Sequence, residues 1–345
     1  MKQKTGVFLI NLGTPDSPEV ADVRRYLREF LMDGRVIDIP FWKRFFLVNG
    51  LIAPFRAPKS SHEYKKLWTD EGSPLLVYGQ KLRDRLQQSL GEEFKVVLGM
   101  RYQSPDIRTG LRAFENTGLE KLIVVPLYPQ YASASTGSTI EKVFDELKRW
   151  ETHPGVTVIS QFFDHPLFLE AFTEITRTYM KKADYDHILF SYHGLPERQI
   201  LKSSMSGYCQ LSQKCCSVYH AKNRYCYRAQ CYQTTRLLAG KLNLSEADYT
   251  VCFQSRLGKD PWIKPFTDEV IGELAKQGKK KILALSPSFV ADCLETTVEI
   301  GQTYHELFRE KGGERLDLVE SLNVHPVWIE CLKSLILESE LQTAR

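Results

Sequence analysis

Short apolar runs of strand length alternate along this chain with longer amphipathic stretches. Several runs are closed by glycine or proline, a pattern typical of buried strands that end in loops. The stretches between them repeat apolar residues at helical spacing, which predicts parallel, right-handed strand–helix–strand units. The predicted strands cover residues 7–12, 95–100, 122–127, 156–162, 188–192, 250–254, 281–286 and 316–320. The predicted helices include residues 17–30, 79–90, 139–150 and 166–180.

The two halves of the chain resemble one another. The similar segments are 8–15 and 189–196, then 97–102 and 251–256, then 123–126 and 284–287. In the first pair a glycine and a proline are in register. Because the three pairs keep the same order, they predict an α/β fold of two similar doubly wound domains. We expect an active site in a cleft between such domains.

The length of 345 residues exceeds the size to which one hydrophobic core grows, so two domains are expected. We place the first at residues 1–160, with an apolar lip at 30–58. The second covers 161–320 and contains a cysteine-rich insert at 208–231. Residues 321–345 are expected to form a C-terminal helix that packs back on the N-terminal domain.

Composition and motifs exclude several classes of protein. The chain is 43% hydrophobic and 26% charged, with a mean hydropathy of −0.30, as in soluble globular proteins. The first residues have no signal-peptide pattern, and no apolar run approaches the roughly 20 residues of a transmembrane helix. Neither G-x-G-x-x-G after a strand nor a P-loop motif is present. We expect a cytoplasmic protein with no nucleic-acid partner, whose oligomeric state the sequence leaves open.

Residues 41–55 form a strongly apolar stretch that carries two cations, Lys43 and Arg44. The stretch is too short to cross a membrane but is suited to lie on one. A helix packed on the core, or a wall for a large apolar ligand, would use the same residue types. The first interpretation predicts peripheral contact with the inner face of the membrane.

His193 follows the predicted strand 188–192 and is followed in turn by glycine and proline. In open α/β sheets ligands bind at the carboxyl ends of strands, and a histidine there can bind a metal or move a proton. A histidine with satisfied hydrogen bonds in the core or a loop is the alternative. A second candidate group lies after the predicted strand 281–286.

Asp292, Glu295 and Glu299 make up this second group, and their i, i+3, i+7 spacing places them on one helical face. Half-buried carboxylates in a line have raised pKa values and can relay protons or guide a divalent cation. The alternative is a solvated face with Asp292 capping the start of the helix.

Together these segments resemble ferrochelatase, the enzyme that inserts Fe²⁺ into a porphyrin to make heme. The similar motifs keep the family's order from residue 11 to about residue 300, so that the resemblance covers nearly the whole chain. They are the segments 11–15, 99–102, 128–131, 135–138, 191–196, 253–258 with 261–262, and 291–296.

The resemblance implies two flavodoxin-like or Rossmann-like domains of the type II chelatase fold, facing a porphyrin cleft. By motif, His193 and Glu295 would handle the substrate iron, while Glu299 and Asp292 would pass protons away or feed iron in. Arg56 and Arg101 match family positions near the porphyrin propionates. The remaining porphyrin-binding residues implied by the resemblance are Leu12, Tyr102, Tyr128, Ser255, Trp262 and Phe289.

The chain departs from some family members at three positions. Cys293 stands where some members carry a second histidine, so a mechanism that needs two histidines does not transfer. In the animal arrangement an iron–sulfur ligand follows the Tyr-Pro-Gln-Tyr motif and the others lie in a C-terminal tail. Here that position is Ser133 and the tail holds only Cys331, so that arrangement is impossible in this chain.

Five of the eight cysteines lie within 23 residues, spaced C-x5-C-C-x9-C-x4-C: Cys209, Cys215, Cys216, Cys226 and Cys231. This enrichment predicts a metal centre rather than disulfides. The pattern lacks C-x2-C pairs, and because some ferrochelatases carry a [2Fe–2S] cluster, it favours that cofactor over zinc. Free thiols in a basic loop are the alternative.

Charge in the insert agrees with a cluster, because residues 198–245 contain eight Lys or Arg and neither Asp nor Glu. Lys214, Lys222, Arg224 and Arg228 would offset the negative charge of a thiolate-bound cluster. Four of the five cysteines would be ligands. Cys209, Cys226 and Cys231 are favoured, with either Cys215 or Cys216, although cluster-free relatives also carry a cysteine at position 231.

The sequence therefore predicts a ferrochelatase that inserts Fe²⁺ into protoporphyrin IX and contains a [2Fe–2S] cluster of structural or sensing role. A chelatase acting on coproporphyrin III, or inserting iron or cobalt into another tetrapyrrole, is the alternative within the enzyme class. A non-catalytic heme or iron–sulfur sensor on the same fold is the alternative outside it.

Overall fold

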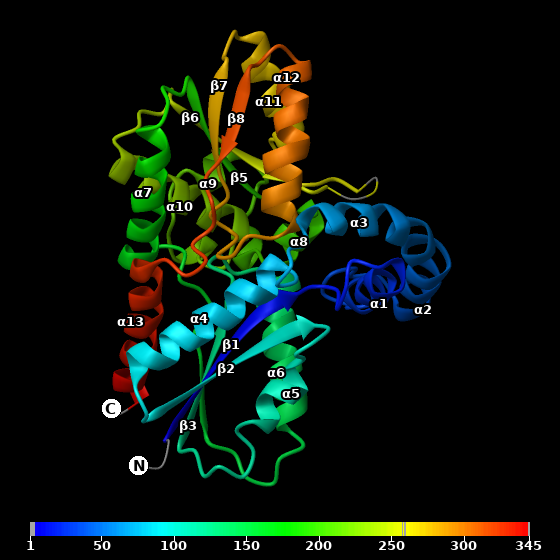
Figure 1. The fold of residues 1–345 in the computed structure, drawn as a ribbon, viewed down its shortest axis with the longest axis vertical. Coiled ribbons are helices and arrows are strands. Elements are labelled where there is room, and N and C mark those ends of the chain that lie inside the picture. Colours follow the sequence, from blue (N-terminus) through cyan, green and yellow to red (C-terminus); the bar gives the residue numbers. More distant parts are fainter. Residues whose placement is uncertain (1–3, 257, 259, 344–345) are drawn as a thin grey trace. The chain divides into compact units, whose positions relative to one another are not determined.

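A computed structural model describes residues 4–256, 258 and 260–343, and within them the chain forms two four-stranded parallel sheets (Figure 1). The strand orders are β2-β1-β3-β4 and β6-β5-β7-β8, which are the same topology used twice. Each of the eight strands predicted from the sequence is present, so the predicted α/β fold class is confirmed. The strands are β1 Thr5–Gly13, β2 Phe94–Tyr102, β3 Lys121–Pro126, β4 Gly155–Val158, β5 His187–His193, β6 Tyr249–Gln254, β7 Lys281–Leu285 and β8 Arg315–Leu318.

The chain divides into two compact units. The N-terminal unit contains residues 1–128, 133–161 and 328–345, and the C-terminal unit contains 129–132 and 162–327. The last helix, α13 (Pro326–Thr343), belongs mostly to the N-terminal unit, where the hydroxyl of Thr5 donates to Glu340 and that of Ser89 to Glu330.

Alternation along β1 fixes the core of the N-terminal unit. Phe8 and Ile10 lie on one face, in an apolar cluster with residues of α5 (Ile107–Arg112) and α6 (Ser138–Leu147). On β2, Leu98 packs against Gly79 of α4 (Pro74–Leu90), where an added Cβ would lie 3.0 Å from its side chain. Helices therefore cover both faces of the sheet, as predicted for a doubly wound domain (Figure 1).

The C-terminal unit repeats this arrangement. Leu189 of β5 and Ala284 of β7 pack in a cluster with residues of α11 (Thr267–Lys276) and α12 (His305–Glu310). Its other helices are α7 (Pro166–Met180), α8 (Glu197–Lys202), η3 (Met205–Gly207), α9 (Gln213–Cys216), η4 (Ala221–Asn223) and α10 (Tyr227–Leu242). Helix α7 has the bounds predicted from the sequence, whereas α1 (Val20–Leu31) begins three residues later than predicted.

Among the described residues three segments wind as π-helices, with i→i+5 hydrogen bonds: η1 (Leu47–Ile52), η2 (Ser133–Gly137) and η5 (Leu294–Tyr304). The sequence predicts α-helical geometry after β7, so η5 is a correction in both helix type and starting residue. π-helical turns are rare in proteins, and those that do occur are often found at functional sites.

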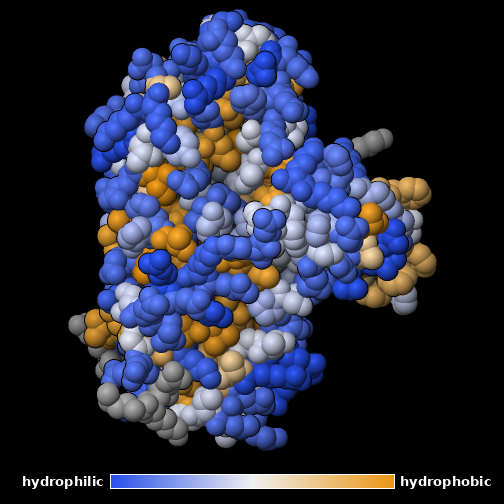
Figure 2. Space-filling model, viewed as in Figure 1, coloured by the Kyte–Doolittle hydropathy of each residue, from blue (hydrophilic) through white to orange (hydrophobic). Residues whose placement is uncertain are grey.

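The apolar stretch at 41–55 forms α2 (Phe41–Phe46), η1 and the first residues of α3 (Ala53–Leu67). It is not a buried core helix, because Trp42 and Phe46 are each 68% exposed and Phe55 is 75% exposed. Figure 2 shows hydrophobic residues gathered at this end of the N-terminal unit, around the position of α2 in Figure 1. We call these exposed residues (Phe41, Trp42, Phe45, Phe46, Leu51 and Phe55) the lip.

Candidate active site

His193 is the last residue of β5, half-buried at the carboxyl end of the C-terminal sheet. Its Nδ1 lies 2.6 Å from the carbonyl oxygen of Gly194. A carbonyl oxygen can only accept, so Nδ1 carries the proton and Nε2 keeps a free lone pair. The fold therefore presents His193 in the tautomer that can accept a proton or ligate a metal.

Glu299 lies on η5, which follows β7, and its carboxylate is held by several donors. Its Oε1 accepts from the backbone N–H of Ser255 at 3.0 Å and from the hydroxyl of Tyr304 at 2.9 Å. Its Oε2 accepts from the hydroxyl of Ser255 and, at 3.4 Å, from the amide of Gln254. Ser255 reaches it twice because its backbone takes the left-handed conformation, with φ 65°, directly after β6.

Gln254 links Glu299 and Glu295 to the histidine strand. It pairs with His193 in the β5–β6 register, and its amide also donates to the carbonyl oxygen of Glu295 at 2.8 Å. Burial raises the pKa of Glu299, and the charge of Glu295 raises it further. Hydrogen bonds from Ser255 and Tyr304 and the nearby His193 act in the opposite direction. The predicted histidine and these two carboxylates therefore share one electrostatic environment at the sheet's carboxyl edge.

Asp292 does not share a helical face with the other two acids, contrary to the prediction from spacing. It precedes η5, and its carboxylate accepts from the backbone N–H of Ser321 at 2.9 Å and from the amide of Asn323 at 2.8 Å. The spacing argument assumed a helix that includes residue 292, whereas Cys293 is the residue that caps η5. Burial raises the pKa of the Cys293 thiol well above its ordinary value.

An aromatic ring lies beside His193, and a second packs on the glycine that follows it. The ring of Phe289 lies 6.5 Å from the imidazole between centroids. A Cβ added at Gly194 would lie 2.8 Å from the carbonyl oxygen of Gln254 and 3.2 Å from the ring of Trp262. Glycine is therefore required at position 194 for the strand edge and Trp262 to pack together.

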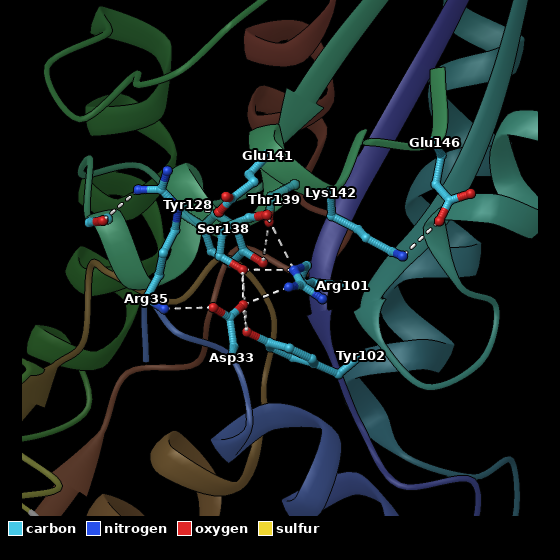
Figure 3. A network of polar contacts seen from close by, with 11 residues as sticks. Asp33, Arg35, Arg101, Tyr102, Tyr128, Ser138, Thr139, Glu141, Lys142 and Glu146 are labelled. Carbon is cyan, nitrogen blue, oxygen red and sulfur yellow. Dashed lines mark hydrogen bonds and ion pairs between the residues drawn. The ribbon is translucent and has the colours of Figure 1, made fainter. Parts of the chain in front are cut away.

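In the N-terminal unit Arg101 and Tyr102, the last residues of β2, converge on the buried carboxylate of Asp33 (Figure 3). Arg101 Nη2 lies 2.6 Å from Asp33 Oδ2, the hydroxyl of Tyr102 donates to the same oxygen at 2.9 Å, and the hydroxyl of Ser138 also donates to it. Burial would raise the pKa of Asp33, but hydrogen bonds from Ser138 and the Arg35 N–H and the charge of Arg101 outweigh it, so the pKa is lowered.

The other residues predicted for porphyrin binding in this unit differ in exposure. Arg56 on α3 is exposed and Leu12 on β1 is half-buried. Tyr102 is fully buried, and Tyr128 is 9% exposed. The hydroxyl of Thr139 donates to the phenolic oxygen of Tyr128 at 3.4 Å. Burial raises the pKa of both tyrosines, so both phenols stay protonated.

Four of the five cysteines of the insert lie together. Cys209 interacts with Cys226 and Cys215, Cys216 interacts with Cys226, and the sulfurs of Cys215 and Cys216 are 3.9 Å apart. Cys231 is fully buried on α10, beside the hydroxyl of Tyr227. Contact with Cys226 is the largest cause that lowers the pKa of Cys209 and of Cys216, each to about 6.

We call the four thiols of Cys209, Cys215, Cys216 and Cys226 the thiol pocket, and a buried cation lies beside them. Arg228 is 5% exposed, and its Nη1 donates to the sulfur of Cys216 at 3.4 Å. Its remaining hydrogen bonds go to the carbonyl oxygens of Ser212 and Lys264 and to the hydroxyl of Tyr232. None of these partners is a carboxylate, and although burial lowers the pKa of Arg228, the charges of Tyr232, Cys216 and Cys215 raise it. In the part of the chain that the structure describes, no three His, Cys, Asp or Glu side chains are arranged to hold a single metal ion.

Sequence reasoning missed Asp33, Ser138, Tyr227 and Tyr304. Tyr304 follows Glu299 by five residues, and because the sequence predicts an α-helix here, this spacing did not indicate their contact. Ser138 ends the family-like segment 135–138 and Tyr227 lies within the cysteine-rich insert, whereas Asp33 belongs to no motif and only its contacts identify it.

Comparisons with known proteins agree with this geometry. The ferrochelatase family model matches residues 4–340. A ferrochelatase of Legionella pneumophila is 48% identical over 335 residues, covering 97% of this chain and 99% of its own, and one of Coxiella burnetii is 45% identical over 340 residues, covering 97% and 94%.

A solved structure with the same fold is the sirohydrochlorin chelatase SirB of Bacillus subtilis subspecies spizizenii in complex with cobalt. Its TM-score is 0.53 at 10% identity, covering 97% of this chain and 95% of that chain. At that identity the likeness shows the fold, a type II chelatase fold, and the two ferrochelatases together with the family model show the family. The chain therefore belongs to the ferrochelatase family.

Proposed function

We propose that this enzyme inserts Fe²⁺ into protoporphyrin IX to form protoheme, the last step of heme biosynthesis, with His193 and Glu295 handling the iron and the proton traffic. The observation that carries this proposal is the free Nε2 lone pair of His193 beside the buried carboxylate of Glu299 and the neighbouring Glu295. Insertion forms four Fe–N bonds, breaks two pyrrole N–H bonds and releases two protons.

His193 is suited to take the first proton, since its Nδ1–H already donates to Gly194 and only Nε2 can accept. Glu299, whose pKa is raised by burial, is suited to receive protons and pass them on. Carboxylates also bind hard divalent cations, so Glu295 can guide the iron while it loses its water shell. We assign Asp292 a supporting role at the start of η5, because its oxygens are engaged by residues 321 and 323.

We assign the porphyrin-binding residues by their match to family positions. They are Trp262, Phe289 and Ser255 in the C-terminal unit, where Phe289 lies beside His193, and Leu12 and Tyr128 in the N-terminal unit. Arg56 is exposed, and Arg101 donates through Nε and one Nη2 hydrogen, which leaves further N–H groups for a propionate. Tyr102 contributes through Arg101, whose guanidinium lies 4.5 Å from its ring centroid.

The test is anaerobic incubation of the purified enzyme with Fe²⁺ or Zn²⁺ and protoporphyrin IX, followed by metalloporphyrin absorbance. His193→Ala and Glu295→Gln should each lower kcat by about 100-fold or more, the usual size of a lost acid–base group. The exposed His153 and Glu306 supply the matched controls His153→Ala and Glu306→Gln, which should keep full rate. Inactive wild type, or full rate in His193→Ala, would refute the assignment.

The same assay separates the alternatives. If kcat/KM is higher with coproporphyrin III than with protoporphyrin IX, coproporphyrin III is the substrate. If the enzyme instead inserts cobalt into another tetrapyrrole, that tetrapyrrole is the substrate. Binding of heme without any metal insertion would favour a sensor.

We further propose that Cys209, Cys215, Cys216 and Cys226 hold a [2Fe–2S] cluster. The four thiols contact one another, Cys209, Cys215 and Cys226 line a small pocket, and the buried Arg228 beside Cys216 can offset the negative charge of a thiolate-bound cluster. Each iron of such a cluster takes two protein sulfurs, so no three-residue site for one ion is required. This set includes both Cys215 and Cys216 and leaves out Cys231. When bound, the cluster supplies a rigid cross-link and a redox-sensitive group.

Visible absorption, iron and acid-labile sulfide analysis of anaerobically purified protein test this proposal. We expect about two irons and two sulfides per chain, the composition of the cluster. Cys209→Ser and Cys226→Ser should lose both, and Cys231→Ser should retain them. Colourless protein, or a cluster lost in Cys231→Ser and kept in Cys226→Ser, would contradict the ligand set.

We propose that the lip is a peripheral membrane contact. Its exposed aromatic side chains lie close to Lys43 and Arg44, a combination that binds the interface of anionic bilayers. No helix among the described residues is long and apolar enough to span a bilayer. Wild type should therefore co-sediment with vesicles of anionic lipid. The double variant Trp42→Ser, Phe46→Ser should leave a larger fraction of the protein in the supernatant. Phe144→Ser, which changes a 47% exposed side chain on α6, is the control, and wild type that stays in the supernatant would refute the contact.

A further inference from the structure

Strand β5, which ends at His193, stops pairing with one of its two neighbouring strands before it reaches the histidine. Pairing of β5 with β7 ends at Phe190 and Leu285, whereas pairing with β6 continues to His193 and Gln254. Two hydroxyl groups bond the carbonyl oxygens of this last stretch. Ser286 donates to the carbonyl oxygen of Ser191 at 2.7 Å, and Tyr227 donates to that of His193 at 2.8 Å.

The Tyr227 phenol contacts the carbonyl oxygen of His193, and Ser288 contacts its backbone N–H. The backbone N–H of His193 lies 3.4 Å from the hydroxyl of Ser288, which is also within hydrogen-bond reach of Tyr227. Tyr227 is 6% exposed, so water cannot readily replace its hydrogen bond. The imidazole direction therefore depends on a side chain outside the sheet.

Tyr227 is the first residue of α10, and its two neighbours in the chain are one of the pocket's cysteines and the arginine that contacts the thiols. Cys226 precedes it as the cap of the helix, and Arg228 follows it with a hydrogen bond to the sulfur of Cys216. Arg228 also donates to the carbonyl oxygen of Lys264, two residues after Trp262. Three consecutive residues thus contact the thiols, the histidine strand and the segment that carries the tryptophan.

We infer that Tyr227 is a positioning residue through which the occupancy of the thiol pocket sets the orientation of His193. A bound cluster would fix Cys226, and with it the first turn of α10, so that the phenol stays under the His193 carbonyl. Without the cluster the turn is free to move and the histidine loses that support. The inference rests on the proposed cluster and chelatase function, and it adds that they are coupled.

The test compares wild type with Tyr227→Phe, which removes only the hydroxyl. In cluster-loaded wild type we expect slow amide hydrogen exchange in the peptide 187–196, and faster exchange after anaerobic removal of the cluster by a chelator. Cluster-loaded Tyr227→Phe should exchange this peptide as fast as the cluster-free wild type. Its kcat should fall about 10- to 100-fold, with KM for porphyrin changed less than about twofold, as for a misplaced group.

Tyr225→Phe is the matched control, because Tyr225 lies in the same insert, is 40% exposed and contacts Tyr131 by its ring. It should keep wild-type exchange and rate. The inference alone would be overturned if the wild type is active and cluster-loaded, and neither removal of the cluster nor Tyr227→Phe changes the amide exchange or kcat. Wild type without iron and sulfide would overturn it together with the cluster proposal, and inactive wild type would refute the proposed function.

Discussion

Replacing Asp33 by alanine should destabilise the N-terminal unit strongly, because one carboxylate accepts from Arg101, Tyr102, Ser138 and the backbone N–H of Arg35. The side chains of Asp33 and Arg101 are only 6% and 14% exposed, so water compensates little for the loss. Removing one partner of a buried ion pair costs about 3–5 kcal/mol. For a unit of this size, each kcal/mol is roughly 2–4 °C in Tm, which gives a fall of roughly 6–20 °C.

Differential scanning calorimetry of the wild type and the variant measures this fall. The matched control is Asp145→Ala, which breaks an ion pair with Lys148 whose side chains are 53% and 70% exposed. Exposed pairs contribute about 0–1 kcal/mol, so the control should hardly change Tm. If Asp33→Ala shifts Tm no more than Asp145→Ala, the reasoning from the buried carboxylate is refuted.

The contribution of Asp33 to the free energy of unfolding should also depend on pH, in a direction set by its pKa. Because the pKa of Asp33 is lowered in the folded state, its contribution is present at neutral pH and is lost as the pH falls through the folded value. The stability difference between wild type and Asp33→Asn, measured by urea denaturation, should therefore shrink at acid pH. A difference that grows toward low pH would contradict this sign.

Two further predictions concern the C-terminal unit. The pKa of Glu299 is raised, so wild type should lose stability as the pH rises from about 4.5 through the folded value, and urea denaturation of Glu299→Gln should not show that loss. Gly194→Ala should cost about 1–3 kcal/mol, because its Cβ would lie 2.8 Å from a backbone oxygen, and should shift the urea midpoint accordingly. Gly272→Ala in α11, where a Cβ meets open space, should be neutral or stabilising, and equal effects at the two glycines would contradict the packing argument.

Helix geometry shows where sequence patterns were insufficient. The i, i+3, i+7 spacing of the acids suited an α-helix, but the segment winds as a π-helix that begins after Cys293. Two of the acids remain close, while Asp292 turns to residues 321 and 323. Single-sequence periodicity cannot distinguish these windings, since both repeat apolar residues every three to five positions.

In the cysteine insert, too, the sequence did not indicate which side chains contact one another. Spacing favoured Cys231 as a ligand and only one of Cys215 and Cys216, because adjacent cysteines rarely bind one small cluster. In the structure the short helix α9 ends with both, whereas helix α10 turns Cys231 toward Tyr227. Which thiols meet is decided by how two helices pack, and no local spacing contains that information.

The sequence by itself determined the eight strands, the repeated topology, the family and the histidine at the end of β5. These follow from apolar periodicity and from motifs a few residues long, which are local properties of the chain. Only the tertiary structure decided which donors hold Glu299, that Asp33 collects Arg101 and Tyr102, and that Tyr227 supports His193. Those contacts join residues far apart along the chain, and they depend on the packing of side chains from different elements.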